Sequence, residues 1–415
     1  MGSHAFIKCG PLTLGQWAAP THELAFQYFP LRNVRRGTRP AKPVAPWQTI
    51  ADIESFLEIH VSAEGFRRRL DLLGFTLTIC CDMLEAALYD ELQFARALEL
   101  YSPPPDLEPD EIIRRIISGA ATLSARAPET PKWLPLPDML AEAAEMSDAA
   151  QRVATDALTN CDEEVLLRLA AEGLHDEIIL DLSGVYQSGL VSEEEIENFE
   201  QKGEHLYLIL TEGSSDRNIL RTGLDRCHPE LSDLFYFADE KLSIPHTGAS
   251  RLTELVKAFV SLKILNRTIV LFDNDAEGAA EHAISLEVST RSGNISPIIL
   301  PELPIFDQIT CLGPNGSHIT SVNRRAAPIE MYLDRCVIDK AANEVEWSTY
   351  LHKAKRWQGN PIAKKELQAY FFRNIDNPSY DISALLQIFE TIFEAASEIG
   401  GNVALENYTL EPVED

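Results

Sequence analysis

The chain is short of positive charge. Its 415 residues include 36 Lys and Arg against 64 Asp and Glu, which gives a formal net charge of -28. This balance argues against a protein that holds nucleic acid through its overall charge, so any such binding needs a local basic patch or bound cations. The length allows two or three domains, and a hydrophobic content of 45% is ample for their cores.

Cysteine motifs and long apolar runs are also missing. The seven cysteines are an odd number and contain no CxxC pair, which argues against a disulfide framework or a zinc ribbon. No run of about 20 apolar residues occurs, so we expect no membrane span. The N-terminus lacks a basic region followed by an apolar core, so we expect no secretory signal and a cytoplasmic location.

The first half of the chain has mainly helical patterns. A β-hairpin is predicted over Ala5–Leu14, with Gly10-Pro11 at its turn. Residues 32–46 are Arg- and Pro-rich, and we expect either an exposed loop or an arm that contacts phosphate. Apolar spacing predicts helices from residue 51 onward, over 78–100, over 108–118 and within 138–189. Ser192 and Glu195 have capping-box spacing and predict a short connecting helix.

The second half begins with strands that alternate with helices. This alternation is typical of βαβ units, which build a parallel sheet flanked by helices with right-handed crossovers. The predicted strands are 206–210, 234–238, 268–272 and 295–300, and the predicted helices are 214–224, 249–262 and 276–289.

Acidic residues follow two of these strands. Glu212 comes after the first strand, and Asp273 and Asp275 come after the third. Ligands of a parallel α/β sheet bind at the carboxyl ends of the strands, so these carboxylates should converge if the two strands are neighbours. Crowded carboxylates favour a bound cation, and oxygen ligands select Mg²⁺ or Mn²⁺. We expect Gly213 and Gly278 to let the backbone turn tightly at the two corners.

Two further acids lie in the same region. Asp216 and Glu277 follow these corners and could hold a second ion. Two ions about 4 Å apart stabilise the attacking and leaving oxygens in phosphodiester cleavage.

These motifs resemble the Toprim domain. Glu212-Gly-x-x-Asp216 and Asp273-x-Asp275-x-x-Gly278 match its pattern over roughly 203 to 335. The resemblance implies Glu212, Asp273 and Asp275 as catalytic metal ligands, with Asp216 and Glu277 at a second ion. In the OLD-type nucleases that carry this domain another acid follows on a later helix, and Glu330 fits that place.

The chain departs from other Toprim proteins. It has no GxxxxGK[ST] motif, so the ATPase half of OLD nucleases is missing, and it lacks the zinc ligands of primases. Nucleotidyl transfer, as in primases, has little support beyond the shared domain. The chain is also too short for a strand-passing topoisomerase.

The N-terminal residues carry a second resemblance. Met1-Gly-Ser, the hairpin and Arg67-Arg-Arg-Leu-Asp-Leu-Leu-Gly-Phe-Thr-Leu77 are similar to the HEPN/Toprim-associated N-terminal domain. That domain precedes effector domains in bacterial proteins connected with phage defence. Arg168 and His175 also fit the short Arg-x4–6-His motif of HEPN ribonucleases, but a surface arginine and a histidine that favours the dipole at a helix end explain the same pattern.

A basic and aromatic segment lies near the C-terminus. It alternates aromatic residues with cations that could contact phosphates while bases stack on the rings. The alternative is an amphipathic helical pair whose aromatic residues form a core. The candidate nucleic-acid-binding cations are Lys353, Lys355, Arg356, Lys364 and Lys365.

The sequence therefore predicts an α/β Toprim domain between helical regions. The expected regions are a mostly α-helical N-terminal domain with a small β-hairpin (1–125), a helical connector (126–202), the Toprim domain (203–335) and a helical C-terminal extension (336–415). The predicted function is Mg²⁺- or Mn²⁺-dependent cleavage of DNA or RNA in bacterial defence. The alternative is a nucleic-acid-binding or assembly protein that cuts only beside a partner. Beyond nucleic acid, the expected partners are a homo-oligomer or a defence-system protein.

Overall fold

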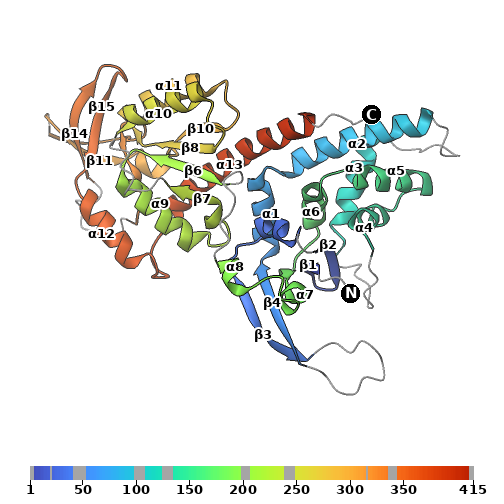
Figure 1. The fold of residues 1–415 in the computed structure, drawn as a ribbon. Coiled ribbons are helices and arrows are strands. Elements are labelled where there is room, and N and C mark those ends of the chain that lie inside the picture. The colour runs from blue at the N-terminus through green and yellow to red at the C-terminus, as the bar shows by residue number, and fades with distance from the viewer. Residues whose placement is uncertain are drawn as a thin grey trace. The chain divides into compact units, whose positions relative to one another are not determined.

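The computed structural model describes two compact units, residues 1–201 and 202–415 (Figure 1). Each unit has its own sheet and its own helices. The described residues are 4–18, 21–40, 53–97, 108–123, 134–197, 206–237, 248–314, 316–334 and 344–410.

The first unit contains a five-stranded sheet in the order β2-β1-β5-β4-β3, and every pair of neighbours is antiparallel. Alternate residues Ala5, Ile7 and Cys9 of β1 are buried, as expected for a strand with one face on a core. The predicted hairpin is confirmed as β1 and β2. The strands are β1 (His4–Cys9), β2 (Leu12–Ala18), β3 (Val34–Pro40), β4 (Ile53–Val61) and β5 (Ile178–Asp181).

Helices supply the rest of this unit. The Ser192 capping box is confirmed, because the Ser192 hydroxyl accepts from the Glu195 N–H at 3.2 Å and the Glu195 carboxylate accepts from the Ser192 N–H at 2.6 Å. No described helix is by itself long and apolar enough to cross a bilayer, and one bent pair, α1 with α2, meets that test jointly. The helices are η1 (Thr21–Tyr28), α1 (Ala63–Leu73), α2 (Leu77–Ala97), α3 (Pro109–Ala120), α4 (Leu136–Ala143), α5 (Asp148–Thr159), α6 (Glu163–Ala171), α7 (Ser183–Gln187) and α8 (Glu193–Glu197).

The helical prediction for residues 51–61 is wrong. Ile53–Val61 form β4, in which Leu57, Ile59 and Val61 are buried at a spacing of two residues. The set Ile53, Phe56, Leu57 and Val61 fits a helical period as well, and pairing with β3 and β5 decides for the strand. The expected loop is also wrong over 34–40, which form β3, and the purely helical connector is wrong at β5.

The two residues of the candidate ribonuclease motif, Arg168 and His175, are in different surroundings. Arg168 is buried, and its guanidinium donates to Asp71 at 2.7 Å and to Glu172. His175 is exposed beyond the end of α6. Arg168 therefore has a structural role, joining α6 to α1.

The second unit is built on a parallel sheet in the order β10-β8-β6-β7. All seven predicted strands and helices are present. They are β6 (Tyr207–Thr211), α9 (Ser214–Cys227), β7 (Phe235–Phe237), α10 (Ala249–Leu262), β8 (Arg267–Phe272), α11 (Ala276–Ser289) and β10 (Ile295–Ile299). A 3-10 helix, η3 (Ser232–Leu234), leads into β7.

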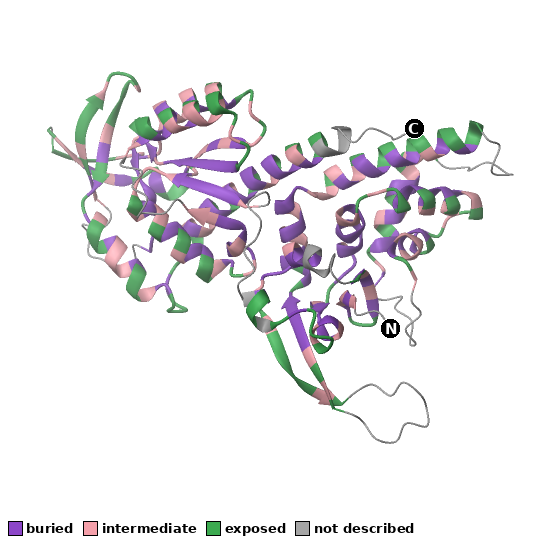
Figure 2. Cartoon of the chain, viewed as in Figure 1, coloured by how far each residue is buried: buried purple, intermediate pink, exposed green. Residues whose placement is uncertain are grey.

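Both faces of this sheet are covered. Leu208 and Leu210 of β6 pack with Leu252 and Val256 of α10 on one face. On the other face the Tyr207 hydroxyl donates to the carbonyl of Ala396 in α13 (Ser383–Leu410) at 2.8 Å. Figure 2 shows that the two central strands of this sheet, β6 and β8, are buried. Strands covered on both faces read as continuous apolar runs, and for this reason the sequence predicts them well.

A second sheet follows, in the order β12-β11-β14-β15. The expected helical extension over 336–415 is wrong at 344–361, because these residues form the β14–β15 hairpin, which is largely exposed (Figure 2). The helical C-terminal extension is confirmed only over α12 and α13. The remaining elements are η5 (Pro304–Phe306), β11 (Ile309–Gly313), β12 (Gly316–Thr320), β13 (Ala326–Ala327), η6 (Ile329–Tyr332), β14 (Glu344–Leu351), β15 (Arg356–Pro361) and α12 (Lys364–Asn374).

Candidate active site

The strand order puts the predicted acids at a switch point. From β6 the chain passes through α9 to β7 on one side, and then through α10 to β8 on the other side of β6. Such a reversal leaves a crevice at the carboxyl ends of the two central strands. Glu212 follows β6 and Asp273 follows β8, and the Asp273 N–H donates to Glu212 Oε1 at 2.9 Å. The first two predicted ligands are therefore brought together.

Asp275 lies on the short strand β9 (Asn274–Asp275), which pairs with β13. Its carboxylate accepts from the N–H of Gly278 at 2.7 Å, which caps α11, and from the side-chain amide of Gln358. A Cβ atom at Gly278 would lie 2.2 Å from the carbonyl oxygen of Asp273. Gly278 is therefore required by the close approach of α11 to the end of β8.

Asp216 and Glu277 differ in exposure. Asp216 is buried and accepts from the N–H of Gly213 at 2.8 Å, which caps α9, while Glu277 is exposed. Gly213 has φ -142°, an extended conformation open to any residue. The expected tight turn at Gly213 is therefore wrong.

Glu330 is fully buried on the 3-10 helix η6, a shorter element than the expected α-helix. Its Oε1 accepts from the amide of Gln368 at 2.5 Å and lies 3.2 Å from the ammonium of Lys364. Its Oε2 is buried with no hydrogen-bond partner. A buried carboxylate oxygen without a donor is costly, so a ligand for this atom would stabilise the site.

The carboxylates raise one another's pKa values. Burial and then the charge of Asp275 raise the pKa of Glu212 to about 8. Burial and then the charge of Glu330 raise the pKa of Asp216 to about 6. The pKa of Asp273 is raised well above its usual range by burial and then by Glu212. The acids therefore crowd together without enough positive charge.

Lys364 supplies part of the missing charge. Burial opposes its protonation, but the charges of Glu330, Asp273 and Asp216 raise the pKa of its ammonium. We predicted this residue as a phosphate contact, and the structure places it against an acid from a different element. Nothing in the sequence pairs residues 330 and 364.

The acid cluster (Glu212, Asp216, Asp273, Asp275 and Glu330) fits a hard divalent cation by chemistry. Its donors are all oxygens, they repel one another, and one buried oxygen has no partner. Within the described part of the chain, no three His, Cys, Asp or Glu side chains are arranged to hold a metal ion. Several of the acids accept hydrogen bonds from backbone N–H groups or side-chain amides. A bound cation would replace some of these donors as the partner of the carboxylate oxygens.

Two amide side chains of the site were missed by the sequence prediction. Gln358 of β15 donates to Asp275 and accepts from the N–H groups of Ala276 and Glu277. Asn274 donates to Asn323 at 3.0 Å and anchors the strand end. The position of Asn274 between Asp273 and Asp275 could have indicated that it belongs to the site. Gln358 lies more than eighty residues from Asp275 in the sequence, so no local pattern indicates it.

Of the other predicted nucleic-acid-binding residues, Lys353, Lys355 and Arg356 lie on the β14–β15 hairpin, whereas Lys365 lies on α12. Lys353 pairs with Glu281, Lys355 and Lys365 are exposed, and Arg356 lies on the hairpin beside the site. The aromatic residues of the hairpin are not core, because Tyr350 and Trp357 are 41% and 43% exposed.

Comparison of the chain with protein-family models, with curated proteins and with solved structures finds no match. The functional case therefore depends on the geometry of the site and on the motif pattern.

Proposed function

We propose that the second unit is a Toprim-type nuclease that hydrolyses phosphodiester bonds of DNA or RNA with Mg²⁺ or Mn²⁺. The observation that carries the proposal is the convergence of Glu212, Asp273 and Asp275 at the switch point of a parallel sheet. Gly278 supports it, because its lack of a side chain lets α11 present Asp275 beside Asp273.

Glu212, Asp273 and Asp275 would hold the first cation, and Asp216, Glu277 and Glu330 a second. A divalent cation bound here supplies Lewis-acid stabilisation of phosphoryl oxygens and lowers the pKa of a water nucleophile. Gln358 positions Asp275 through its amide, and its own carbonyl is fixed by two backbone N–H groups of α11.

Proton exchange accompanies loading of the site. With a pKa of about 8, the Glu212 carboxyl is largely protonated at neutral pH before a cation binds. Carboxylates must lose their protons to become metal ligands, so binding releases protons and strengthens as the pH rises through about 8. Before a cation binds, the ammonium of Lys364 balances the charge of Glu330.

The setting we propose is bacterial anti-phage defence, and its support is the resemblance of residues 1–125 to a defence-associated domain. A second candidate is a protein that cuts only beside a partner. The contact between Lys364 and Glu330 favours this version, because a cation of the chain itself already lies on one of the ligands.

The test is cleavage of plasmid, linear DNA, single strands and total tRNA with Mn²⁺ or Mg²⁺. We expect wild type to cleave at least one substrate and Glu212→Gln to lose that activity while it folds like wild type. Asp376→Asn is the matched control, since Asp376 is 87% exposed in the same unit. Cleavage by Glu212→Gln at the wild-type rate would contradict the assignment. Mn²⁺ binding without cleavage of any substrate would favour the partner-dependent candidate.

A further inference from the structure

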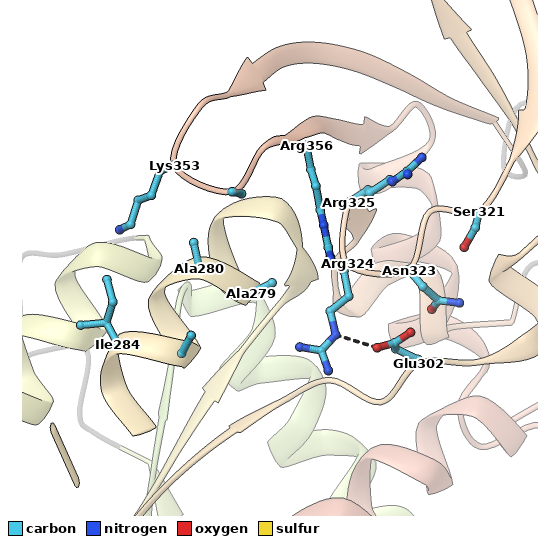
Figure 3. Close-up of a pocket in the computed structure, with 12 residues that line it drawn as sticks. Ala279, Ala280, Ile284, Glu302, Ser321, Asn323, Arg324, Arg325, Lys353 and Arg356 are labelled. Atoms are coloured by element: carbon cyan, nitrogen blue, oxygen red, sulfur yellow. Dashed lines mark hydrogen bonds and ion pairs between the residues drawn. The ribbon is translucent and has the colours of Figure 1, made fainter. Parts of the chain in front are cut away.

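A pocket of about 740 Å³ (Figure 3) includes Arg325, which forms a β-bridge with Asp275 of the acid cluster. Its walls come from α11, from the loop 321–325 and from the tip of the β14–β15 hairpin. Three alanines of α11, Ala279, Ala280 and Ala283, line one wall and leave the space open. The volume lies within the range of about 300–1,000 Å³ that is usual for ligand sites.

Four cations line this pocket: Arg324, Arg325, Lys353 and Arg356. Arg324 pairs with Glu302 at 2.7 Å, as Figure 3 shows, and Lys353 pairs with Glu281. Neither Arg325 nor Arg356 forms an ion pair within the described part of the chain. In a chain of net charge -28, such a local excess of positive charge points to an anionic ligand.

The pocket is tied to the acid cluster through the backbone. Arg325 forms a β-bridge with Asp275, and the N–H of Arg324 donates to Oδ1 of Asn274 at 2.6 Å. Arg324 has φ +58°, a left-handed conformation that is unusual for a residue with a side chain. The loop that carries both arginines is therefore held in a strained conformation against the strand end that carries Asp273 and Asp275.

The hairpin completes the pocket from the other side. Arg356 and Gln358 lie two residues apart on β15, so their side chains share one face of the hairpin. Gln358 donates to Asp275, which turns that face toward the acid cluster. Tyr350 and Trp357 are paired on the opposite face, with ring centroids 5.7 Å apart. Tyr350 and Trp357 therefore do not line the pocket, which presents positive charges to a ligand but, among the described residues that line it, no aromatic ring on which a base could stack.

We propose that this pocket binds phosphate groups of the nucleic-acid strand next to the bond that is cut. The inference rests on the proposed function for the identity of the ligand. Guanidinium groups match phosphate oxygens through paired N–H donors, and Arg325 and Arg356 are the groups available for this contact. Contacts to phosphates position a strand without reading its sequence, so the pocket fixes the register of the substrate and leaves sequence preference to other residues.

The test is the binding of fluorescein-labelled single-stranded DNA, single-stranded RNA and duplex DNA, measured by anisotropy in EDTA. Arg325→Ala/Arg356→Ala should weaken binding about tenfold or more. It should also make the negative slope of log K against log salt shallower by about 1.4–1.8. The matched control is Arg291→Ala/Arg373→Ala, which removes two exposed cations outside the pocket. The control should change the affinity less than about threefold.

Two outcomes overturn the inference: equal loss in the pocket and control variants, and no binding of any strand by wild type. Because the measurement needs no divalent cation, a protein that binds through the pocket and never cuts would fail only the proposed function. A nuclease whose pocket variant binds like wild type would fail only the inference. If the double variant unfolds, Arg356→Ala alone, at an exposed position, should still weaken binding about threefold.

Discussion

Buried acids occur in both units, but their surroundings differ. In the sheet of the first unit Asp181 is buried beside Lys8, at 2.5 Å, with Arg39 3.9 Å away. Burial raises the pKa of its carboxyl, but the hydrogen bond and charge of Lys8, together with the hydrogen bonds from Ser183, bring the pKa below its usual value. In the second unit burial raises the pKa values of Glu212 and Asp273, and the neighbouring acids raise them further.

We infer from this difference that Asp181 has a structural role, whereas the acid cluster has the role that we propose for it. An acid that folding supplies with its own cation is complete within the chain. An acid cluster that lacks enough cations lowers the stability of the folded protein and persists where function needs it. Within the second unit, the pair of Lys364 and Glu330 is the arrangement most similar to the ion pair of Asp181 and Lys8.

The largest expected effect is on activity. Asp273→Asn removes a carboxylate that we propose as a cation ligand and should lower the cleavage rate at least about 10³-fold. Asp181→Asn should leave the rate per folded molecule unchanged, because Asp181 has its partners in the other unit. Initial rates with Mn²⁺, normalised to folded protein, check both, and equal rates for Asp273→Asn and wild type would refute the role of the cluster.

Stability should respond in the opposite sense. Asp181→Asn leaves Lys8 without its acid and should lower the free energy of unfolding by about 2 kcal/mol. Asp273→Asn removes one carboxyl group from the crowded acid cluster and should leave that free energy unchanged or raised in EDTA. Urea unfolding of the two variants measures the contrast. A large loss of stability in Asp273→Asn would mean that its charge is already compensated.

Two glycines beside the site give a smaller contrast. Gly278→Ala places a Cβ atom 2.2 Å from a carbonyl oxygen and should cost about 2 kcal/mol of unfolding free energy. Gly213→Ala meets the Asp216 carboxylate at 3.3 Å in an extended backbone and should cost about 0.5 kcal/mol or less. Thermal unfolding compares them, and equal losses would contradict the close approach of α11.

The last expected effect is on the pH dependence of the metal-free protein. The Glu212 pKa of about 8 lies above its ordinary value of 4.5, so its contribution to stability is complete below pH 4.5 and is lost as the pH rises through 8. We expect a decline of about 2.5 kcal/mol between pH 6 and 8.5 in EDTA, because one pKa unit corresponds to about 1.4 kcal/mol. Glu212→Gln should show a smaller decline. Identical profiles would place the titration elsewhere.

The parallel sheet and its acids could be predicted because the information is local. Each strand is a continuous apolar run, and each acid follows its strand directly, as at Leu210 and Glu212. The hairpin at Trp347 and Trp357 could not be predicted, because exposed aromatic and basic residues fit a strand and a helix equally well. The contact between Lys364 and Glu330 depends on tertiary packing and left no local signal.

The most direct test of the central claim is calorimetric titration of Mn²⁺ into the metal-free protein at pH 7 and at pH 8.5, beside Asp273→Asn. We predict that wild type binds Mn²⁺ with release of protons at pH 7 and more tightly at pH 8.5, and that Asp273→Asn binds at least about tenfold more weakly. Equal Mn²⁺ affinity in the two proteins, or no binding to wild type, would contradict the account.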